Sequence, residues 1–376
     1  MSEQPILDRH YMARALELAR KGLYTTHPNP RVGCVIVCDG QVVGEGWHVR
    51  AGEPHAEVHA LRQAGELARG STAYVTLEPC SHHGRTPPCA DALVKAGVAR
   101  VVAAMQDPNP QVAGNGLRRL QEAGITVASG VLEAEARAIN PGFIKRMEHG
   151  LPYVRVKLAM SLDGRTAMAS GESQWITGAA ARSAVQRLRA CSSVVLTGAD
   201  SVLMDGARMT VRAAELGLDK TTTTLIEARP PLRLLIDGRL RVPLDAPFFT
   251  AGPALVVACE ASQQAHYAAA GHELLALPGA DGLVDLPALL AVLAARGVSE
   301  VLVEAGARLA GAFARQGLVD EYQIFIAAKF LGSQARPLLE WPLTLMNEAP
   351  ALKITDMRAV GDDWRVTAIP VPAAGV

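Results

Sequence analysis

The sequence predicts an α/β protein made of two domains, and three observations support this prediction. The chain has 376 residues, 49% of them hydrophobic, which exceeds the usual size of one domain and allows each half its own core. Strand-like and helix-like segments alternate along both halves, as they do in α/β folds. At residues 149–152 the sequence His-Gly-Leu-Pro separates a helical stretch from an alternating one. We therefore expect one domain over residues 1–150 and another over residues 151–376.

The first half is predicted to be a three-layer domain, with helices packed on a central sheet. Apolar residues recur at helical spacing over residues 7–21. Asp39-Gly40 lies between two strand-like runs and is typical of a β-hairpin turn. The expected strands span residues 32–37, 41–47, 73–76, 98–105 and 125–128, and the further helices span residues 57–67, 90–96, 116–123 and 132–146.

The second half begins with a clearly alternating strand over residues 154–161. Apolar residues alternate with polar or small ones along it, so that its two faces differ. The polar or small-residue face is made of Arg155, Lys157, Ala159 and Ser161. Further strands are expected over residues 194–197, 232–236, 254–258, 301–304 and 322–327, and helices over residues 179–191, 286–295 and 307–316. Residues 213–229 are polar and Thr-rich without a clear period, so we expect a loop there.

Charge and composition limit the classes of partner. Lys plus Arg number 37 and Asp plus Glu also number 37, whereas a protein that neutralises nucleic-acid backbones usually has a basic excess. No apolar stretch approaches the roughly 20 residues needed to cross a bilayer. Residues 1–5 carry no basic, apolar signal sequence. We expect a cytoplasmic protein that has neither nucleic acid nor membrane as its main partner.

A metal-binding pattern occupies the first half. His55, Cys80 and Cys89 offer one imidazole and two thiolates, a normal zinc ligand set that leaves one coordination position open, as catalytic zinc sites do. The two thiolates neutralise the formal charge of Zn²⁺, so a carboxylate is needed to move protons, and Glu57 has that role. His55 and Glu57 converge only where a helix begins, which Pro54 favours. The pattern predicts one catalytic zinc ion per chain.

Two other interpretations of these residues are possible. The histidine and cysteines could be ordinary core residues, or they could form a structural zinc site, which normally has four protein ligands. The remaining cysteines lie in or beside apolar segments and are predicted to be core residues: Cys34, Cys38, Cys191 and Cys259.

Zinc deaminases of nucleobases carry the pattern H-x-E…P-C-x-x-C, and this chain departs from it by placing eight residues between its cysteines. With that spacing, the sequence resembles the bifunctional deaminase–reductase family of riboflavin biosynthesis. The segments that carry the resemblance are residues 28–33 (PNPRVG), 46–48 (GWH), 79–89, 107–110 (DPNP) and 157–164 (KLAMSLDG). The resemblance spans nearly the whole chain, and these segments include two unrelated sets of motifs in the order of the family.

The resemblance implies two reactions and two folds. A cytidine-deaminase-like first domain would remove the 2-amino group of 2,5-diamino-6-ribosylamino-4(3H)-pyrimidinone 5′-phosphate as ammonia. A dihydrofolate-reductase-like second domain would then use NADPH to reduce the ribosyl group to ribityl. The cofactors implied are Zn²⁺ and NADPH, and a homo-oligomer is possible.

The resemblance also implies a pyrimidine pocket in the first domain. Asn29 would hydrogen-bond the pyrimidine, and His48, His82 and Arg85 would line the same pocket, whereas His83 is expected to face solvent. Asn29 could instead be only a turn residue between two prolines.

In the second domain there is no G-x-G-x-x-G after a strand, so the cofactor site must be built in another way. Lys157 is the expected catalytic residue, on a strand face that could instead be merely solvated. The resemblance implies substrate contacts from Ser173, Arg189, Met209 (through its backbone), Arg212 and Glu304. It implies cofactor contacts from Ala159, Ser161, Trp175, Ser201, Asp205, Gly238, Gly306, Ala307, Arg308 and Leu309. Without the resemblance, a lone tryptophan such as Trp175 is more typical of a core. Arg189 could bind the substrate phosphate, which an arginine suits, or it could be a surface cation.

Two competing functions remain at this stage. One is a deaminase of nucleosides or tRNA with an accessory domain, which the neutral charge and the cysteine spacing disfavour. The other is a non-catalytic, zinc-dependent binding protein, which the intact Glu57 disfavours.

Overall fold

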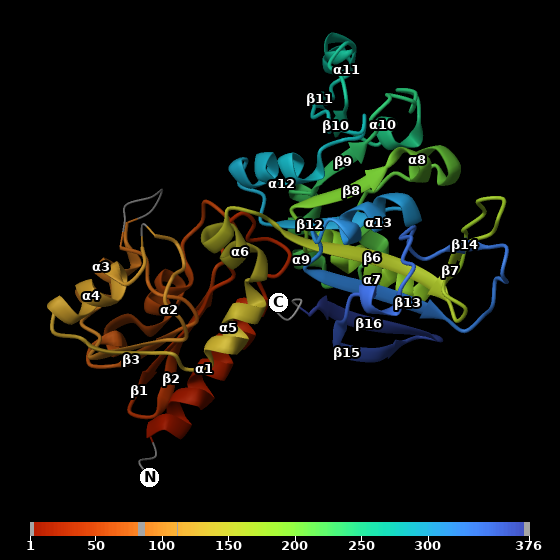
Figure 1. The fold of residues 1–376 in the computed structure, drawn as a ribbon. Helices are drawn as coiled ribbons and strands as arrows, with labels where there is room; N and C mark the ends of the chain where they lie inside the picture. Colours follow the sequence, from red (N-terminus) through yellow and green to blue (C-terminus); the bar gives the residue numbers. More distant parts are fainter. Residues whose placement is uncertain (1–3, 82–86, 111, 372–376) are drawn as a thin grey trace. The chain divides into compact units, whose positions relative to one another are not determined.

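The computed structural model describes residues 4–81, 87–110 and 112–371, and the chain divides into two compact units, Met1–Leu151 and Pro152–Val376 (Figure 1). Each unit contains its own sheet. Among the described residues, no helix has both the length and the apolar character that crossing a membrane requires.

Unit 1 is built on a five-stranded sheet with the order β2-β1-β3-β4-β5. The strands are β1 (Gly33–Cys38), β2 (Gln41–Trp47), β3 (Thr72–Val75), β4 (Arg100–Ala103) and β5 (Thr126–Ser129). The strands β1 and β2 form the expected antiparallel hairpin, and both Asp39 and Gly40 have positive φ in its turn. The strands β3, β4 and β5 run parallel to one another.

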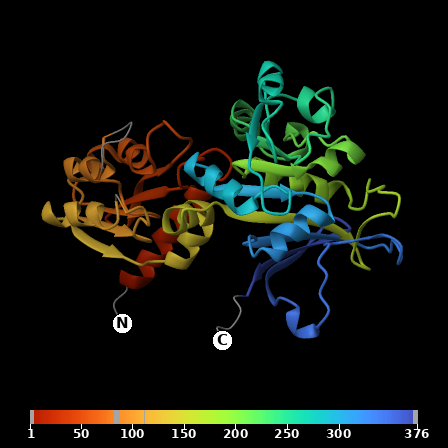
Figure 2. The same ribbon diagram turned by 45° about the horizontal axis from the view of Figure 1, so that its top comes forward.

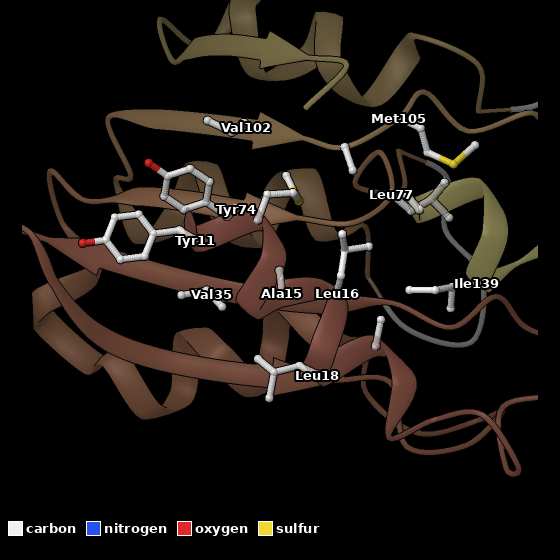
Figure 3. Close-up of a cluster of buried hydrophobic side chains, with 14 of the residues drawn as sticks. Tyr11, Ala15, Leu16, Leu18, Val35, Tyr74, Leu77, Val102, Met105 and Ile139 are labelled. Carbon is white, nitrogen blue, oxygen red and sulfur yellow. The ribbon is translucent and has the colours of Figure 1, made fainter. Parts of the chain in front are cut away.

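Helices cover both faces of this sheet. They are α1 (Gln4–Arg20), α2 (Ala56–Ala64), α3 (Cys89–Ala96), α4 (Asn115–Glu122), α5 (Glu133–Ile139) and α6 (Pro141–His149), with a 3₁₀ turn η1 (Gly65–Ala68) after α2. Alternate residues of one strand enter different cores: Val35 packs with α1 and α5, whereas Ile36 packs with α2 and α3. Figure 3 shows the first of these cores. The predicted three-layer arrangement is confirmed.

The helix predicted over residues 132–146 is wrong in one respect, because it is interrupted at Asn140. Pro141 begins a second helix, since proline is tolerated only in the first turn. The Asn140 side chain bonds the backbone of Arg31 twice, at 2.7 Å and 2.9 Å, and this pairing holds the break in place.

Unit 2 is built on a nine-stranded sheet with the order β11-β10-β9-β8-β12-β6-β13-β16-β15. The first seven strands in this order are parallel, and β16 and β15 complete the sheet in antiparallel fashion. The strands are β6 (Tyr153–Ser161), β8 (Val194–Gly198), β9 (Leu232–Ile236), β10 (Leu255–Ala258), β11 (Glu273–Ala276), β12 (Glu300–Glu304), β13 (Glu321–Ala327), β15 (Leu352–Val360) and β16 (Asp363–Pro370). In both ribbon views, β6 runs between β12 and β13 (Figures 1 and 2).

Short strands and helices complete unit 2. A separate pair is formed by β7 (Arg165–Ala167) and β14 (Arg336–Pro337). The helices are α7 (Ala179–Ala190), α8 (Ala199–Asp205), α9 (Lys220–Ala228), α10 (Pro247–Thr250), α11 (Gln264–Ala269), α12 (Leu286–Ala295) and α13 (Ala307–Arg315), with 3₁₀ turns η2 (Ala213–Glu215) and η3 (Met346–Glu348).

The loop predicted over residues 213–229 is wrong, because α9 lies within it. The Asp219 carboxylate accepts a hydrogen bond from the backbone N–H of Thr222 at 2.9 Å and caps this helix. Ile226 is its one buried residue, so the helix has no apolar stripe that a periodicity search could detect.

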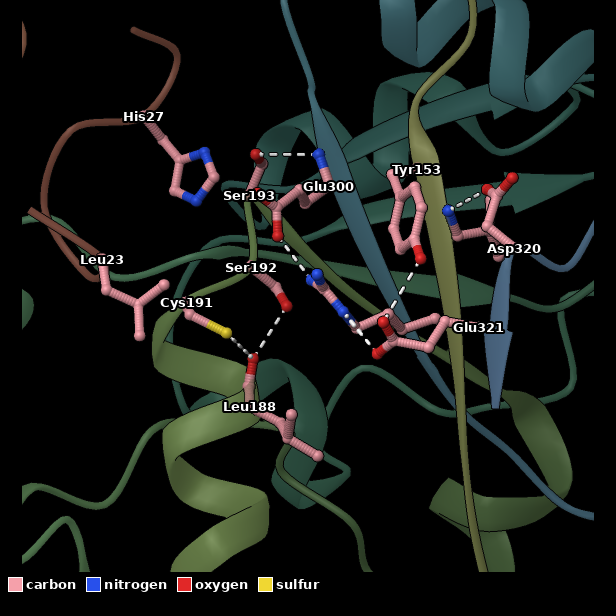
Figure 4. Close-up of polar contacts among 12 residues, drawn as sticks. Leu23, His27, Tyr153, Leu188, Cys191, Ser192, Ser193, Glu300, Asp320 and Glu321 are labelled. Carbon is pink, nitrogen blue, oxygen red and sulfur yellow. Dashed lines mark hydrogen bonds and ion pairs between the residues drawn. The ribbon is translucent and has the colours of Figure 1, made fainter. Parts of the chain in front are cut away.

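Charged side chains join the three central strands of the sheet. Arg155 on β6 donates to Glu300 on β12 at 2.5 Å and to Glu321 on β13 at 2.9 Å (Figure 4). Tyr153 donates its hydroxyl to the other oxygen of Glu321 at 3.2 Å. The Tyr153–Arg155 end of this face of β6 is therefore partly exposed and paired with the neighbouring strands.

The cysteine predictions are confirmed for two residues and wrong for two. Cys34 and Cys191 are buried, whereas Cys38 and Cys259 are partly exposed. Both partly exposed cysteines lie at the ends of strands, where the apolar run has already finished.

Candidate active sites

Two helix starts and one loop bring the predicted zinc ligands together in unit 1. His55 is the N-cap residue of α2, and Cys89 is the first residue of α3. Cys80 lies in the loop that follows β3. Gly46 on β2 allows α2 to approach the sheet closely, since a Cβ atom there would lie 2.3 Å from the carbonyl oxygen of Ala56.

The distances between these side chains fit a tetrahedral metal. The Nδ1 atom of His55 lies 3.7 Å from Sγ of Cys80 and 3.3 Å from Sγ of Cys89, and all three ligand atoms lie within 4.8 Å of one another. Nitrogen and sulfur ligands at about 2.0 Å and 2.3 Å from a tetrahedral zinc are roughly 3.5 Å apart. The residues present therefore fit Zn²⁺ without rearrangement.

The environment of Glu57 also supports a zinc site at this position. The residue is 3% exposed, and its Oε2 atom is buried without a hydrogen-bond partner among the described atoms. A buried carboxylate oxygen without a partner is costly, and a bound ligand at the zinc position would relieve that cost. Burial raises the pKa of the Glu57 carboxyl, although the His55 ring opposes this effect.

The electrostatics of Cys80 favour the thiolate form. Hydrogen bonds from the Cys89 thiol, the His55 ring and the Cys89 backbone N–H (at 3.3 Å) lower the pKa of Cys80 to about 4, with the contribution of the Cys89 thiol the largest and burial opposing it. Thiolates are the form that binds metals. The same contact with Cys80 raises the pKa of His55 in the absence of a metal ion.

The structure brings Asn29 and His48 to this site. The His48 ring lies 5.2 Å from the His55 ring in an edge-to-face arrangement, and its Nε2 atom lies 3.0 Å from Nδ2 of Asn29. The other ring nitrogen of His48 is 3.2 Å from the carbonyl oxygen of Pro54, which can only accept. His48 must therefore donate from Nδ1 and accept at Nε2, so Asn29 donates its amide N–H and keeps its carbonyl oxygen available. Burial lowers the pKa of His48 to about 4, which keeps the ring neutral.

Glu78 organises the same region, and the sequence analysis missed it. Its buried carboxylate accepts hydrogen bonds from the backbone N–H groups of Asp107, Gly114, Gly116 and Leu117, at 2.8–3.3 Å. It thus ties residues 107–117 to the turn that carries Cys80. Its partners lie 29 to 39 positions further along the chain, so no local sequence signal identifies this role. His82, His83 and Arg85 lie outside the described residues.

Unit 2 has a cavity of about 990 Å³ at the carboxyl ends of β6, β12, β8 and β9. Ligands collect at such strand ends in open α/β sheets. The predicted residues that line the cavity are Lys157, Ala159, Ser173, Trp175, Arg189, Ser201, Asp205, Met209, Arg212, Gly238, Glu304, Gly306, Ala307, Arg308 and Leu309.

Lys157, Glu304 and Arg189 form the charged centre of this cavity, in which Glu304 and Arg189 are buried and Lys157 is partly exposed. Lys157 and Glu304 are register partners on the neighbouring strands β6 and β12. Arg189, from α7, donates to both oxygens of Glu304, at 2.6 Å and 2.9 Å. Burial lowers the pKa of Lys157 although Glu304 opposes the shift. The pKa of Glu304 is lowered despite its burial, because Arg189 and Lys157 stabilise the carboxylate.

Two site predictions need correction. Ser161 does not line the cavity, because it is fully buried and its hydroxyl bonds Asp163 and the backbone N–H of Arg165 within one turn. The surface-cation alternative for Arg189 is wrong, since this residue is 8% exposed and paired with Glu304. Its guanidinium donates hydrogen bonds to Glu304 and to the carbonyl oxygen of Thr210.

Around this centre, three loop residues are held by side-chain contacts. Ser173 donates its hydroxyl to Asp205 at 2.9 Å, and Arg182 lies 4.7 Å from the Trp175 ring centroid. Trp175 is 61% exposed beside the cavity, so the core interpretation of this residue is wrong. Met209 has a positive φ of 55° and a buried side chain, and it is one of the residues that line the cavity.

The opening turn of α13 fits a phosphate group of a dinucleotide. Gly306 is the N-cap residue, and no atom lies within 4 Å of the position that a Cβ would take there. The N–H groups of Ala307, Arg308 and Leu309 have no partner within the helix, because they belong to its first turn. The open space at Gly306 and the N–H donors of this turn fit a phosphate group of NADPH, and the cavity volume fits a molecule of that size.

The two units define a class of protein, a zinc-binding deaminase domain followed by a reductase domain. Residues 5–105 match the cytidine and deoxycytidylate deaminase zinc-binding region, and residues 152–366 match the RibD C-terminal domain. The domains of this class use Zn²⁺ and NADPH.

Known proteins narrow this class to a family. The chain is 54% identical to the riboflavin biosynthesis protein RibD of Escherichia coli over 95% of this chain and 97% of that protein. It is 48% identical to RibD of Haemophilus influenzae over 96% of each. Its structure superposes on Acinetobacter baumannii RibD with a TM-score of 0.89 at 46% identity, covering 98% of this chain and 99% of that one. The deaminase/reductase of Thermotoga maritima gives a TM-score of 0.85 at 33% identity, covering 98% and 100%. The chain belongs to the RibD family, which confirms the resemblance found in the sequence.

Proposed function

We propose that unit 1 hydrolytically deaminates 2,5-diamino-6-ribosylamino-4(3H)-pyrimidinone 5′-phosphate and that unit 2 reduces the ribosyl group of the product with NADPH. The observation that carries this proposal is the triad of His55, Cys80 and Cys89 beside Glu57, whose Oε2 atom has no hydrogen-bond partner among the described atoms. The Thermotoga maritima relative is named as a diaminohydroxyphosphoribosylaminopyrimidine deaminase and 5-amino-6-(5-phosphoribosylamino)uracil reductase, which supports the choice of substrate.

In the deamination, His55, Cys80 and Cys89 would hold the metal, and zinc bound there would lower the pKa of a water molecule to about 7 and so supply a nucleophile at neutral pH. Glu57 takes a proton from that water and delivers it to the 2-amino nitrogen, which leaves as ammonia. Burial raises the pKa of Glu57, which makes its carboxylate a stronger base than an ordinary glutamate.

The pyrimidine is oriented by Asn29 in this proposal. His48 holds the Asn29 amide with its N–H toward the imidazole, so that the carbonyl oxygen can accept an N–H from the pyrimidine ring. His48 acts there as a neutral ring, in keeping with its lowered pKa.

In the reduction, the cavity residues named above would hold NADPH, which would supply the hydride that C1 of the ribosyl group accepts. The bond between C1 and the ring oxygen breaks, and that oxygen takes up a proton to become a hydroxyl. Lys157 is the residue that stabilises the developing negative charge, and its lowered pKa eases proton donation. Glu304, which Arg189 holds in place, lies beside Lys157 on the neighbouring strand, and its carboxylate attracts the ammonium group.

Further contacts follow from the cavity. Arg212 would bind the substrate phosphate, and its ion pair with Glu215 (2.9 Å) keeps it at the cavity rim. Ser173 and the backbone of Met209 would contact the sugar. Ala159, Trp175, Ser201, Asp205, Gly238 and residues 306–309 would contact the cofactor. Action without nucleic acid or membrane, a cytoplasmic location and a homo-oligomeric state remain predictions.

The proposal is tested by incubating the protein with the diaminopyrimidinone phosphate, with and without NADPH, followed by mass spectrometry. Without NADPH we expect ammonia and a product in which oxygen replaces the 2-amino group. With NADPH we expect the same compound carrying two more hydrogen atoms in its side chain. Release of ammonia from free nucleosides or tRNA, but not from this substrate, would contradict the proposal.

A further inference from the structure

Two arginines share one carboxylate at an outer part of the unit 2 cavity. Arg241 donates to Oδ1 of Asp200 at 2.8 Å, and a guanidinium nitrogen of Arg308 lies 3.9 Å from Oδ2 of the same residue. All three residues line the cavity. The Arg241 and Arg308 side chains are 48% and 72% exposed, so both can exchange Asp200 for another anion without leaving a buried charge.

The sheet topology places Arg241 well away from the charged centre. Moving along the sheet from Lys157 on β6, the neighbouring strands are β12, β8 and β9, and Arg241 follows β9. Three strand spacings correspond to about 14 Å. The N-terminus of α13, where a pyrophosphate fits, follows β12 and therefore lies between the two. A dinucleotide with its nicotinamide beside Lys157 would thus carry its adenosine toward Arg241.

A tight turn fixes the position from which Arg241 extends. The buried Asp237 accepts hydrogen bonds from the backbone N–H of Val242 at 2.8 Å, and its own carbonyl accepts from Leu240 at 3.1 Å. The carboxylate of Asp237 also lies 3.9 Å from Nε of Arg241. The backbone is therefore ordered before any ligand binds, while the remaining N–H donors of the guanidinium are available.

We propose that Arg241, assisted by Arg308, binds the 2′-phosphate of the NADPH adenosine and thereby selects NADPH over NADH. A phosphomonoester matches the planar fork of arginine and can replace the Asp200 carboxylate, whereas the 2′-hydroxyl of NADH carries no charge to do so. This inference rests on the proposed reductase function of unit 2 and adds its cofactor selectivity.

The experiment measures binding of adenosine 2′,5′-bisphosphate and adenosine 5′-monophosphate to the full chain by isothermal titration calorimetry. We expect the wild type to bind the bisphosphate at least tenfold more tightly. Arg241→Ala should weaken bisphosphate binding roughly 10- to 100-fold, the scale of one charge-assisted hydrogen bond, and leave the monophosphate unchanged. Arg308→Ala should also weaken bisphosphate binding without changing monophosphate binding, but by a smaller factor.

Arg296→Ala is the matched control. Arg296 is likewise a partly exposed arginine paired with a carboxylate, Glu273 at 2.6 Å, but it does not line the cavity. In steady-state assays, Arg241→Ala should raise KM for NADPH, preserve kcat, and leave both the NADH reaction and ammonia release unchanged.

The outcomes separate this inference from the function on which it rests. If the wild type reduces the deaminated intermediate but binds both adenosine phosphates equally, or if Arg241→Ala keeps the preference for the bisphosphate, the assignment of Arg241 is overturned. If the wild type fails to oxidise NADPH with that intermediate, the reductase function itself fails, whatever the nucleotide affinities are.

Discussion

Glu57 is the residue on which the deaminase chemistry depends most directly. Glu57→Gln keeps the size of the side chain but cannot carry a proton, so we expect deamination to fall by about 100-fold or more while zinc content is unchanged. Ammonia release and elemental analysis measure the two quantities. Glu53→Gln, at the partly exposed ion pair with Arg50, is the control. Near-normal ammonia release from Glu57→Gln would remove this residue from the mechanism.

The metal ligands can be tested independently of turnover. Cys80→Ala and Cys89→Ala should each lose most of the zinc, because a three-ligand site has no spare protein donor. Cys38→Ala, in the same unit but partly exposed and away from the ligand cluster, should retain it. Equal zinc content in all three variants would show that the ligand set is wrong.

His48 predicts a specific pH dependence of stability. Its pKa falls from the ordinary value of about 6.5 to about 4 in the folded protein, so the unfolded chain binds more protons between these pH values. The stability of unit 1 should therefore decrease by up to about 3 kcal/mol as the pH falls from 6.5 to 4.

His48→Gln removes this titration, and its unfolding temperature should depend less on pH than that of the wild type. Calorimetry at pH 7.5 and pH 5 measures the difference, since acid effects on the zinc ligands are common to both proteins. Identical pH dependence in the two proteins would refute the role given to His48.

At the scale of elements, the sequence predicts most strands and helices that have a clear apolar period. The β1–β2 hairpin and the alternating β6 are found where the patterns placed them. The exceptions have local causes: α9 depends on the Asp219 cap, and the break between α5 and α6 depends on contacts of Asn140 with a segment more than a hundred residues away. Strand β15 was not predicted, and its residues are mostly exposed, so burial imposes no strict alternation.

Some active-site residues were likewise predictable from the sequence, and others were not. The zinc residues were predictable because their spacing carries the chemistry. The ion pair between Arg189 and Glu304 was not, because it joins α7 to the end of β12 across 115 positions of sequence. Glu78 and Arg241 were missed because their roles appear only in the folded turns around them.

Asp8 joins α1 to the sheet and gives a prediction at this scale. Its carboxylate is 6% exposed and accepts two hydrogen bonds from Arg100 on β4, both at 2.7 Å, and one from Tyr74 on β3 at 3.0 Å. Asp8→Asn should destabilise unit 1 by about 3 kcal/mol, because it leaves the arginine charge without its partner. Chemical denaturation measures this loss. Glu17→Gln, at an exposed ion pair on the same helix, should cost less than about 1 kcal/mol, and equal costs would contradict the argument.

At the scale of the whole molecule, each unit has its own sheet, and unit 1 has two cores on that sheet. Residues 1–151 expressed alone should bind zinc and release ammonia from the diaminopyrimidinone phosphate. Residues 152–376 should oxidise NADPH only when supplied with the deaminated compound. Circular dichroism and the two assays test this division, and two unfolded fragments would contradict the independence of the cores.

The central claim is that one chain carries two sites that act in sequence, and a mixing experiment tests it most directly. Glu57→Gln and Lys157→Ala are each incubated with the diaminopyrimidinone phosphate and NADPH, then mixed, and the products are identified by mass spectrometry. We expect Glu57→Gln alone to leave the diamine unchanged, Lys157→Ala alone to accumulate the deaminated ribosyl compound, and the mixture to yield the ribityl product. Formation of the ribityl product by Lys157→Ala alone at the wild-type rate would contradict the account.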